Sequence, residues 1–354
     1  LFFFQGQLFS DYEFLKEDIE IWSDGTRMKG NLFIPRDENI KKWLTILMVH
    51  GWGGTKDHLN TAYATKFAAA GFMVMTFDYR GWGESDSRLV IYKDMPKPSR
   101  WSNKVKVEAI AIRELVDPLD QYEDIQSCLY FLEGDSRVDS SRIGIWGSSF
   151  GGGHAIMVGA KDPRIRVIVS QVGGMGTDMG LYSQELKKRL IKQARREEDP
   201  VPQGVDIVPG LRGTPHLGRM ALYQPISVAK NIKVPTLSII IGEGASGGAL
   251  GIGLTDKIIC FENTWYSVIS PENCSTILWH SWDYKEQAAE ALKLTAEDML
   301  KNKLIDGIIN EPVGGAHTYP EKMFKILKKE ILINLEELSK QSFENLVKER
   351  MKKF

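Results

Sequence analysis

The sequence carries almost no net charge. Its 354 residues include 45 Lys and Arg against 46 Asp and Glu, which gives a formal net charge of −1. A near-neutral chain has no long-range attraction to nucleic acid or to anionic lipid, and we find no basic stripe that would create one. The composition therefore predicts neither a nucleic-acid partner nor a membrane partner.

Cysteines and long apolar runs are also scarce. The three cysteines share no metal-ligand or Cys-x-x-Cys spacing, and their odd number argues against a disulfide framework. No stretch approaches the roughly 18 uninterrupted apolar residues of a membrane span, and the first six residues are too short for a secretory signal. We therefore expect a soluble, cytoplasmic protein without a bound metal or cofactor. Residues 1–15 do not begin with Met, and we interpret them as a tail outside the fold, left by processing or by cloning.

Strand and helix patterns alternate through the first two-thirds of the chain. Residues 18–22 and 28–34 alternate like the strands of a hairpin around a Ser-Asp-Gly-Thr turn. Residues 43–49 and 72–77 are almost continuously apolar, as are strands buried on both faces of a parallel sheet. The other predicted elements are helices at 62–70, 119–132 and 150–160 and strands at 142–146 and 165–170. This alternation predicts a doubly wound α/β fold.

The five residues from Gly147 to Gly151 read Gly-Ser-Ser-Phe-Gly and predict a nucleophile elbow. A serine hydroxyl is a poor nucleophile until a base removes its proton, so it must stand on a tight turn that the base can reach. The two glycines allow strand and helix to approach closely while Ser149 takes a strained backbone conformation. We predict that Ser149 is the nucleophile and that Ser148 is a turn hydroxyl.

A glycine-rich loop, His50-Gly-Trp-Gly-Gly54, directly follows the predicted strand at 43–49. Its glycines let the backbone N–H of Trp52 turn toward the nucleophile and join that of Phe150 as an oxyanion hole. We interpret His50 as a structural hydrogen-bonding group because the catalytic histidine follows the serine in this kind of enzyme. The loop at residues 78–85 is expected to fix the surroundings of the site.

Three segments, HGWGG, FDYRGWGESD and RIGIWGSSFGGGHA, resemble the α/β-hydrolase superfamily, especially its dienelactone-hydrolase-like and X-Pro-dipeptidyl-peptidase-like members. The resemblance covers about residues 16–236. It implies hydrolysis of a small-molecule ester, thioester or peptide-type acyl bond through an acyl-enzyme, without a cofactor. A cap would lie at residues 178–216, where a solvated helix and loop is an equal alternative.

The Asp that this family carries after the seventh strand is missing here. Instead, residues 241–250 (IGEGASGGAL) and 311–317 (EPVGGAH) resemble the carboxyltransferase α subunit of bacterial acetyl-coenzyme A carboxylase, in a match that covers about residues 235–354. That resemblance implies a crotonase-like fold, a coenzyme A ester as substrate, and an oxyanion site made by the backbone N–H groups of Gly247 and Gly248. The half of the carboxyltransferase site that precedes this segment in the family has no counterpart here.

Residues 237–354 also admit a simpler interpretation, in which they complete the hydrolase sheet. Strands at 237–241 and 257–261 would then be its seventh and eighth, and the amphipathic helix at 320–338 would pack last. Glu243 would be the triad acid and His317 the base. A third alternative is a catalytically inactive scaffold, and nothing in the sequence decides whether the chain forms a homo-oligomer.

Overall fold

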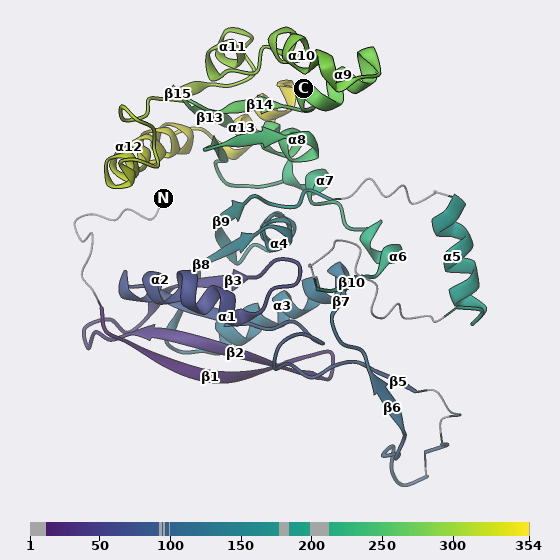
Figure 1. Cartoon of the computed structure of the whole chain (residues 1–354). Helices are drawn as coiled ribbons and strands as arrows, with labels where there is room; N and C mark the ends of the chain where they lie inside the picture. Colours follow the sequence, from purple (N-terminus) through teal and green to yellow (C-terminus); the bar gives the residue numbers. More distant parts are fainter. Residues whose placement is uncertain are drawn as a thin grey trace. The chain divides into compact units, whose positions relative to one another are not determined.

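The computed structural model describes residues 12–91, 94, 96–98, 100–176, 184–198 and 212–353. It divides into two compact units, an N-unit that ends at Pro225 and a C-unit that begins at Ile226 (Figure 1). None of the described helices is long and apolar enough to cross a membrane.

The N-unit is built on a six-stranded sheet in the order β1-β2-β4-β3-β8-β9. β2 is antiparallel to β1 and β4, and the remaining pairs are parallel. The strands are β1 (Phe14–Ser23), β2 (Thr26–Pro35), β3 (Trp43–Val49), β4 (Met73–Phe77), β8 (Val138–Ser148) and β9 (Ile165–Gln171). The predicted α/β class is confirmed, and so is the opening hairpin, whose turn residues Asp24 and Gly25 both have positive φ, 45° and 74°.

Helices connect the parallel strands of the N-unit. They are α1 (Lys56–Leu59), a π-helical turn (Asn60–Ala64), α2 (Thr65–Ala69), α3 (Pro118–Gly134) and α4 (Phe150–Gly159). The first of these begins six residues before the predicted start at residue 62. The predicted start is wrong because the helix is capped further upstream, where the N–H of Thr55 donates to His58 Nδ1 at 3.1 Å.

The sheet is buried on both faces, as the apolar runs predicted. Along β3, Leu47 and Val49 belong to one core cluster, whereas Met48 belongs to the other with Trp146 of β8. The N-unit also contains two short strand pairs, β5 (Leu89–Ile91) with β6 (Ala109–Ala111) and β7 (Leu115–Val116) with β10 (Thr214–Pro215). Of the predicted cap, the structure describes α5 (Gln184–Ala194), and residues 177–183 and 199–211 lie outside the described residues. α6 (Leu217–Met220) follows, and α7 (Pro225–Ala229) begins at the last residue of the unit.

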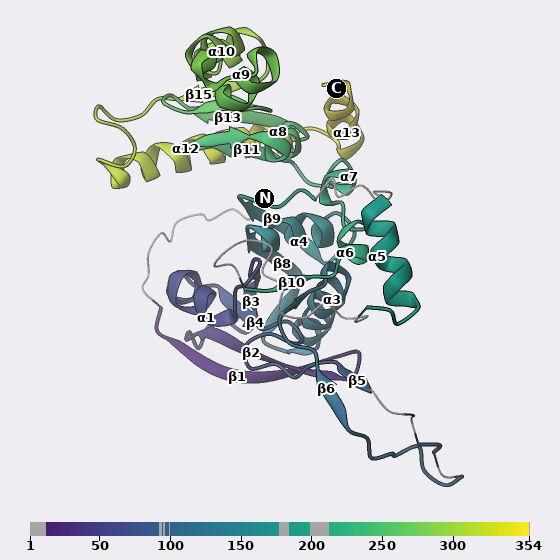
Figure 2. The same cartoon turned by 45° about the vertical axis from the view of Figure 1, so that its right-hand side comes forward.

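The C-unit has its own parallel sheet, β11 (Leu237–Ile240), β13 (Lys257–Phe261) and β15 (Gly307–Ile309), and a second parallel pair, β12 (Glu243–Ala245) with β14 (Trp265–Ser267). Its helices are α8 (Ser246–Gly253), α9 (Pro271–Trp279), a 3-10 turn (Trp282–Tyr284), α10 (Lys285–Leu292), α11 (Ala296–Lys301), α12 (Pro320–Ser339) and α13 (Phe343–Lys352). Figure 2 shows α12 running along the three-stranded sheet, where Met323 packs on Phe261 and Ile309. The helix predicted at 320–338 is thereby confirmed.

The interpretation in which β11 and β13 complete the hydrolase sheet is wrong. β13 hydrogen-bonds to β11 on one side and to β15 on the other, and among the described residues β9 pairs with β8 alone. The sheet of the C-unit buries a cluster on each face, around Cys260 on one side and Phe261 on the other. The tail is therefore a separate folding unit with its own core.

A buried ion pair fastens the end of the chain to the start of the C-unit. The Arg350 guanidinium donates to both oxygens of Asp256 at 2.9 Å and to the carbonyl oxygen of Ile232 at 3.1 Å. Asp256 in turn accepts from the N–H of Thr236 at 2.7 Å. Because this buried pair has both charges matched and carries further hydrogen bonds to the backbone, it holds α13 against the start of the C-unit.

Candidate functional site at the nucleophile elbow

Ser149 stands at the junction of β8 and α4 with φ 56° and ψ −125°, a region that side-chain-bearing residues rarely adopt, and its side chain is exposed. Its N–H donates to the carbonyl oxygen of Gln171 at 2.9 Å, and its carbonyl oxygen accepts from Gly174 at 2.9 Å. A Cβ on Gly147 would lie 2.1 Å from the carbonyl oxygen of Gly151, so only glycine fits there. The elbow conformation predicted from the sequence is present.

The loop after β3 packs directly against this elbow. A Cβ on Gly51 would lie 3.0 Å from Cβ of Ser149 and 3.4 Å from the backbone nitrogen of Phe150. The rings of Trp52 and Phe150 meet edge to face with centroids 5.8 Å apart. Within the described part of the chain, the backbone N–H groups of Trp52 and Phe150 have no hydrogen-bond acceptor. Such unengaged donors can stabilise the negative oxygen that forms when a carbonyl is attacked.

Two buried histidines lie behind the elbow. His50 Nδ1 is 3.0 Å from the carbonyl oxygen of Gly51, and burial lowers the pKa of His50 to about 4, despite that hydrogen bond and nearby Asp78. His154 Nε2 is 2.9 Å from Oε1 of Gln121, and burial lowers the pKa of His154 to about 3, assisted by His50. Both rings are therefore neutral near pH 7.

The two histidines share a buried polar cluster with Tyr79 and Tyr223. The ring centroids of His50 and Tyr79 are 4.5 Å apart, and those of His154 and Tyr223 are 5.0 Å apart. Burial raises the pKa of both tyrosines well above the ordinary value. The hydroxyls, together with His50 Nε2 and His154 Nδ1, have no hydrogen-bond partner among the described residues. Sequence reasoning missed this cluster because its members come from separate segments.

Asp78 ties the loop after β4 to the start of α1. One oxygen of its buried carboxylate accepts from the N–H of Lys56 at 2.7 Å, and the other accepts from the N–H of Glu84 at 3.0 Å. The Lys56 ammonium, itself buried, lies 3.3 Å from Asp78 and also pairs with Glu84. The loop at residues 78–85 therefore holds the start of α1 in place.

The remaining predicted site residues belong to the C-unit. Gly247 and Gly248 lie in the first turn of α8, where backbone N–H groups are free of helical partners, and a Cβ on Gly248 would meet no atom within 4 Å. Glu243 is exposed on β12. His317 lies in the loop before α12. Its charge acts on the carboxylate of Glu311.

Glu311 has a well-defined environment of its own. Its oxygens accept from the N–H groups of Ala316 at 2.8 Å and Asn263 at 3.1 Å. Burial raises its pKa, but these hydrogen bonds and the charge of His317 outweigh burial and leave the pKa below the ordinary value. The sequence interpretation had named Glu243 as the partner of His317, and the EPVGGAH segment itself was the signal that could have pointed to Glu311.

The structure thus brings Ser149, Trp52 and Phe150 together in the N-unit and places Glu243, Gly247, Gly248 and His317 in the C-unit. None of the described imidazoles of the N-unit hydrogen-bonds to Ser149. Among the described residues, no group of three or more His, Cys, Asp or Glu side chains could hold a metal ion.

The strand order and elbow of the N-unit define an α/β-hydrolase fold, and residues 24–187 match the family described as X-Pro dipeptidyl-peptidase (S15 family). Residues 132–354, more than half of the chain, match the family described as acetyl co-enzyme A carboxylase carboxyltransferase-like. The chain belongs to this second family. The two matches overlap at residues 132–187, where β8, α4 and β9 follow the hydrolase arrangement.

Curated relatives match about half of the chain. The acetyl-coenzyme A carboxylase carboxyl transferase subunit alpha of Chlorobium limicola is 48% identical over 169 residues, 47% of this chain and 51% of that protein. The corresponding subunit of Flavobacterium psychrophilum is 49% identical over 169 residues, 47% of this chain and 53% of that protein. The chain therefore spans about half the length of these relatives.

The similar solved structures include the alpha/beta hydrolase GrgF from a Penicillium species, with a TM-score of 0.48 and 16% identity over 89% of this chain and 98% of that one. An acetyl xylan esterase from a Paenibacillus species has a TM-score of 0.42 and 19% identity over 67% of this chain and 71% of that one.

Proposed function

We propose that the N-unit is a serine hydrolase that cleaves ester, thioester or peptide-type acyl bonds of small molecules, with Ser149 as nucleophile. The observation that carries the proposal is the conformation of Ser149, an exposed serine held at φ 56° between glycines. Backbone strain of this kind costs about 1–3 kcal/mol and persists where the surroundings enforce it, which is common at catalytic positions.

In this mechanism the Ser149 hydroxyl attacks the carbonyl carbon and passes its proton to a base. The N–H groups of Trp52 and Phe150 stabilise the resulting oxyanion, assisted by the positive end of the α4 dipole. Collapse of the tetrahedral intermediate expels the leaving group and leaves an acyl group on Ser149, which water then hydrolyses. The base is a histidine, and the order of catalytic residues in the superfamily places it after Ser149 in the sequence.

Hydrolysis of p-nitrophenyl acetate tests the assignment. Ser149→Ala should lower the rate by a factor on the order of 10³ or more, because the nucleophile is lost while the oxyanion hole remains. The adjacent Ser148→Ala is the matched control and should keep most of the activity. Activity in Ser149→Ala equal to that of the parent would refute the proposal, and a parent protein without activity would favour an inactive scaffold.

A second candidate is carboxyl transfer to or from a coenzyme A ester. One observation in its favour is that 169 residues of the chain are 48% identical to a carboxyltransferase subunit. Another is that the backbone N–H groups of Gly247 and Gly248 lie in the first turn of α8, where they have no helical acceptor. The N-unit, however, supplies a hydrolase sheet in place of the other half of the carboxyltransferase site. We therefore infer that the C-unit does not catalyse this reaction in the present chain.

A further inference from the structure

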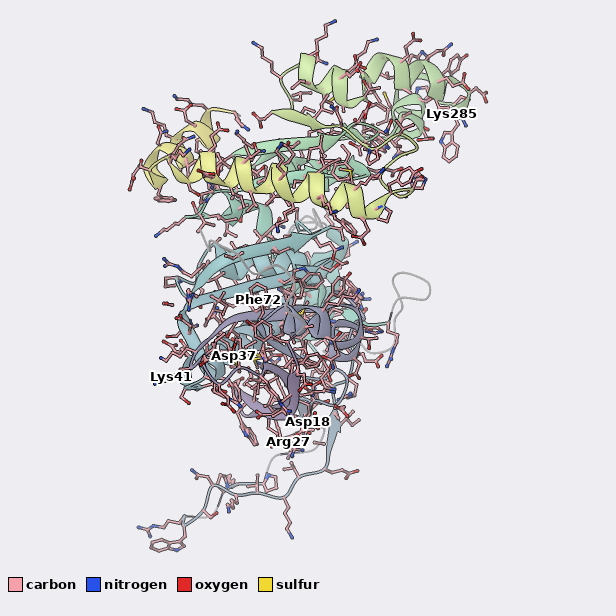
Figure 3. The ribbon with its side chains drawn as sticks, turned by 90° about the vertical axis from the view of Figure 1, so that its left-hand side faces the viewer. Asp18, Arg27, Asp37, Lys41, Phe72 and Lys285 are labelled. Carbon is pink, nitrogen blue, oxygen red and sulfur yellow. The ribbon has the colours of Figure 1, made fainter. Side chains whose placement is uncertain are left out.

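A narrow arm, described at residues 89–91, 94, 96–98 and 100–111, projects from the N-unit. It begins and ends with the antiparallel strands β5 and β6, and the N–H of Ile112 donates to the carbonyl oxygen of Arg88 at 2.8 Å where the two sides meet. Figures 1, 2 and 3 agree that the arm leaves the body of the unit, and its side chains in Figure 3 point into open space.

The base of the arm is firmly attached. Arg113 donates to the carbonyl oxygens of Ser85 at 2.6 Å and Gly83 at 2.7 Å, and Arg88 forms an ion pair with Asp120 on α3. A two-stranded ribbon of this size gains little stability by itself, so these contacts hold its direction. The base of the arm is therefore anchored to the body of the N-unit.

The outer part of the arm is strongly cationic. Residues 97–106 contain four positive side chains and no Asp or Glu, a local charge of +4 in a chain whose net charge is −1. These side chains, all exposed, are Lys97, Arg100, Lys104 and Lys106. The net charge of the whole chain is close to zero and therefore does not reveal this local positive segment.

An almost fully exposed tryptophan lies among these cations. Trp101 is 90% exposed, and the Arg100 guanidinium lies 5.8 Å from its ring centroid. Val107 and Ile110 are also exposed, at 39% and 46%. An indole ring has an apolar body and a polar N–H, and such rings prefer the headgroup level of a bilayer, where Lys and Arg meet lipid phosphates.

We propose that the arm docks on an anionic phospholipid surface, with Trp101 entering the interface and the surrounding cations contacting headgroups. Single-stranded nucleic acid is the main rival, because it also combines phosphates with rings that stack on aromatic side chains. Val107 is aliphatic and exposed. Its burial among acyl chains is favourable, whereas a phosphodiester backbone offers it no apolar contact, so a lipid surface is the favoured partner.

Co-sedimentation of the full chain with phosphatidylcholine vesicles containing about 30% phosphatidylserine tests this proposal. The parent should bind these vesicles and be released by about 0.5 M NaCl, because screening weakens the attraction. The double variant Lys104→Glu/Lys106→Glu should lower the partition coefficient by about 25-fold or more, at about fivefold for each lost cation. Trp101→Ala should lower it severalfold. Trp22→Ala, which removes another exposed tryptophan, on β1, should have no effect.

Several outcomes would overturn the proposal, provided that the variants keep the circular dichroism spectrum of the parent. They are absence of binding, equal binding to pure phosphatidylcholine vesicles, and arm variants that bind like the parent. Arm-dependent binding to a thymidine oligonucleotide without vesicle binding would instead identify nucleic acid as the partner. Arm-dependent self-association without vesicle binding would identify a second copy of the chain.

Discussion

At the scale of single residues, the buried imidazole of His154 links pH to stability. Its folded pKa of about 3 lies below the unfolded value of about 6.5. The unfolded chain therefore binds more protons between these values, and stability is present above about pH 6.5 and is lost as the pH falls toward 3. The loss from this ring is about 1.4 kcal/mol per pH unit.

The variant His154→Phe removes this titration. In urea unfolding between pH 6.5 and pH 4, we expect its free energy of unfolding to fall less steeply with pH than that of the parent. An unchanged slope in His154→Phe would show that another group controls acid unfolding.

The second residue-scale prediction concerns the base. If Ser149 is active, its proton must pass to a histidine, and the order of catalytic residues in the superfamily favours His317. His317→Ala should lower ester hydrolysis by a factor on the order of 10³ or more. His280, which ends α9 in a left-handed conformation, provides the control, and His280→Ala should change the rate little. Equal rates for His317→Ala and the parent would reject His317.

At the scale of elements, Asp78 joins the end of β4 to the start of α1. Asp78→Ala would leave the Lys56 ammonium, only 5% exposed, without its buried counter-ion. We expect a loss of about 3 kcal/mol in the free energy of unfolding, measured in urea, because an unpaired buried charge is costly. Asp57→Ala removes a 71%-exposed partner of the same lysine and should cost less than about 1 kcal/mol. Equal losses would contradict this role for Asp78.

The elements that could be predicted from the sequence are those specified by local patterns. β3 was predicted with its observed ends because its residues are apolar on both faces, and Ser149 was located because paired glycines and a following helix define the elbow. Pairing between distant strands has no such local pattern. The sequence of residues 237–261 does not indicate that β13 pairs with β11 and β15. It therefore could not distinguish a separate sheet in the C-unit from a continuation of the hydrolase sheet.

The arm escaped prediction for a related reason. β5 and β6 are three residues each and lie 17 residues apart, too short and too distant for a periodicity or a turn signal. The buried cluster of His50, Tyr79, His154 and Tyr223 likewise arises from tertiary packing of four segments. In both cases the sequence shows the residues but not which other residues lie beside them in the folded protein.

At the scale of the whole molecule, the chain joins two units with separate cores, one hydrolase-like and one carboxyltransferase-like. We expect no biocytin-dependent decarboxylation of malonyl-coenzyme A, because the residues before the C-unit build a hydrolase-like sheet and not the other half of a carboxyltransferase site. Measurable turnover that is lost in Gly247→Val but kept in Gly242→Val, where a side chain meets open space, would contradict this expectation.

The central claim is that Ser149 is an activated nucleophile. Labelling with a fluorophosphonate probe, followed by mass spectrometry of the modified peptide, tests it most directly, because the probe reacts with a serine whose proton is removed by a base. We predict a single adduct on Ser149 that is retained in Ser148→Ala and absent in Ser149→Ala. Undiminished labelling of Ser149→Ala, or an unlabelled parent protein, would contradict the account.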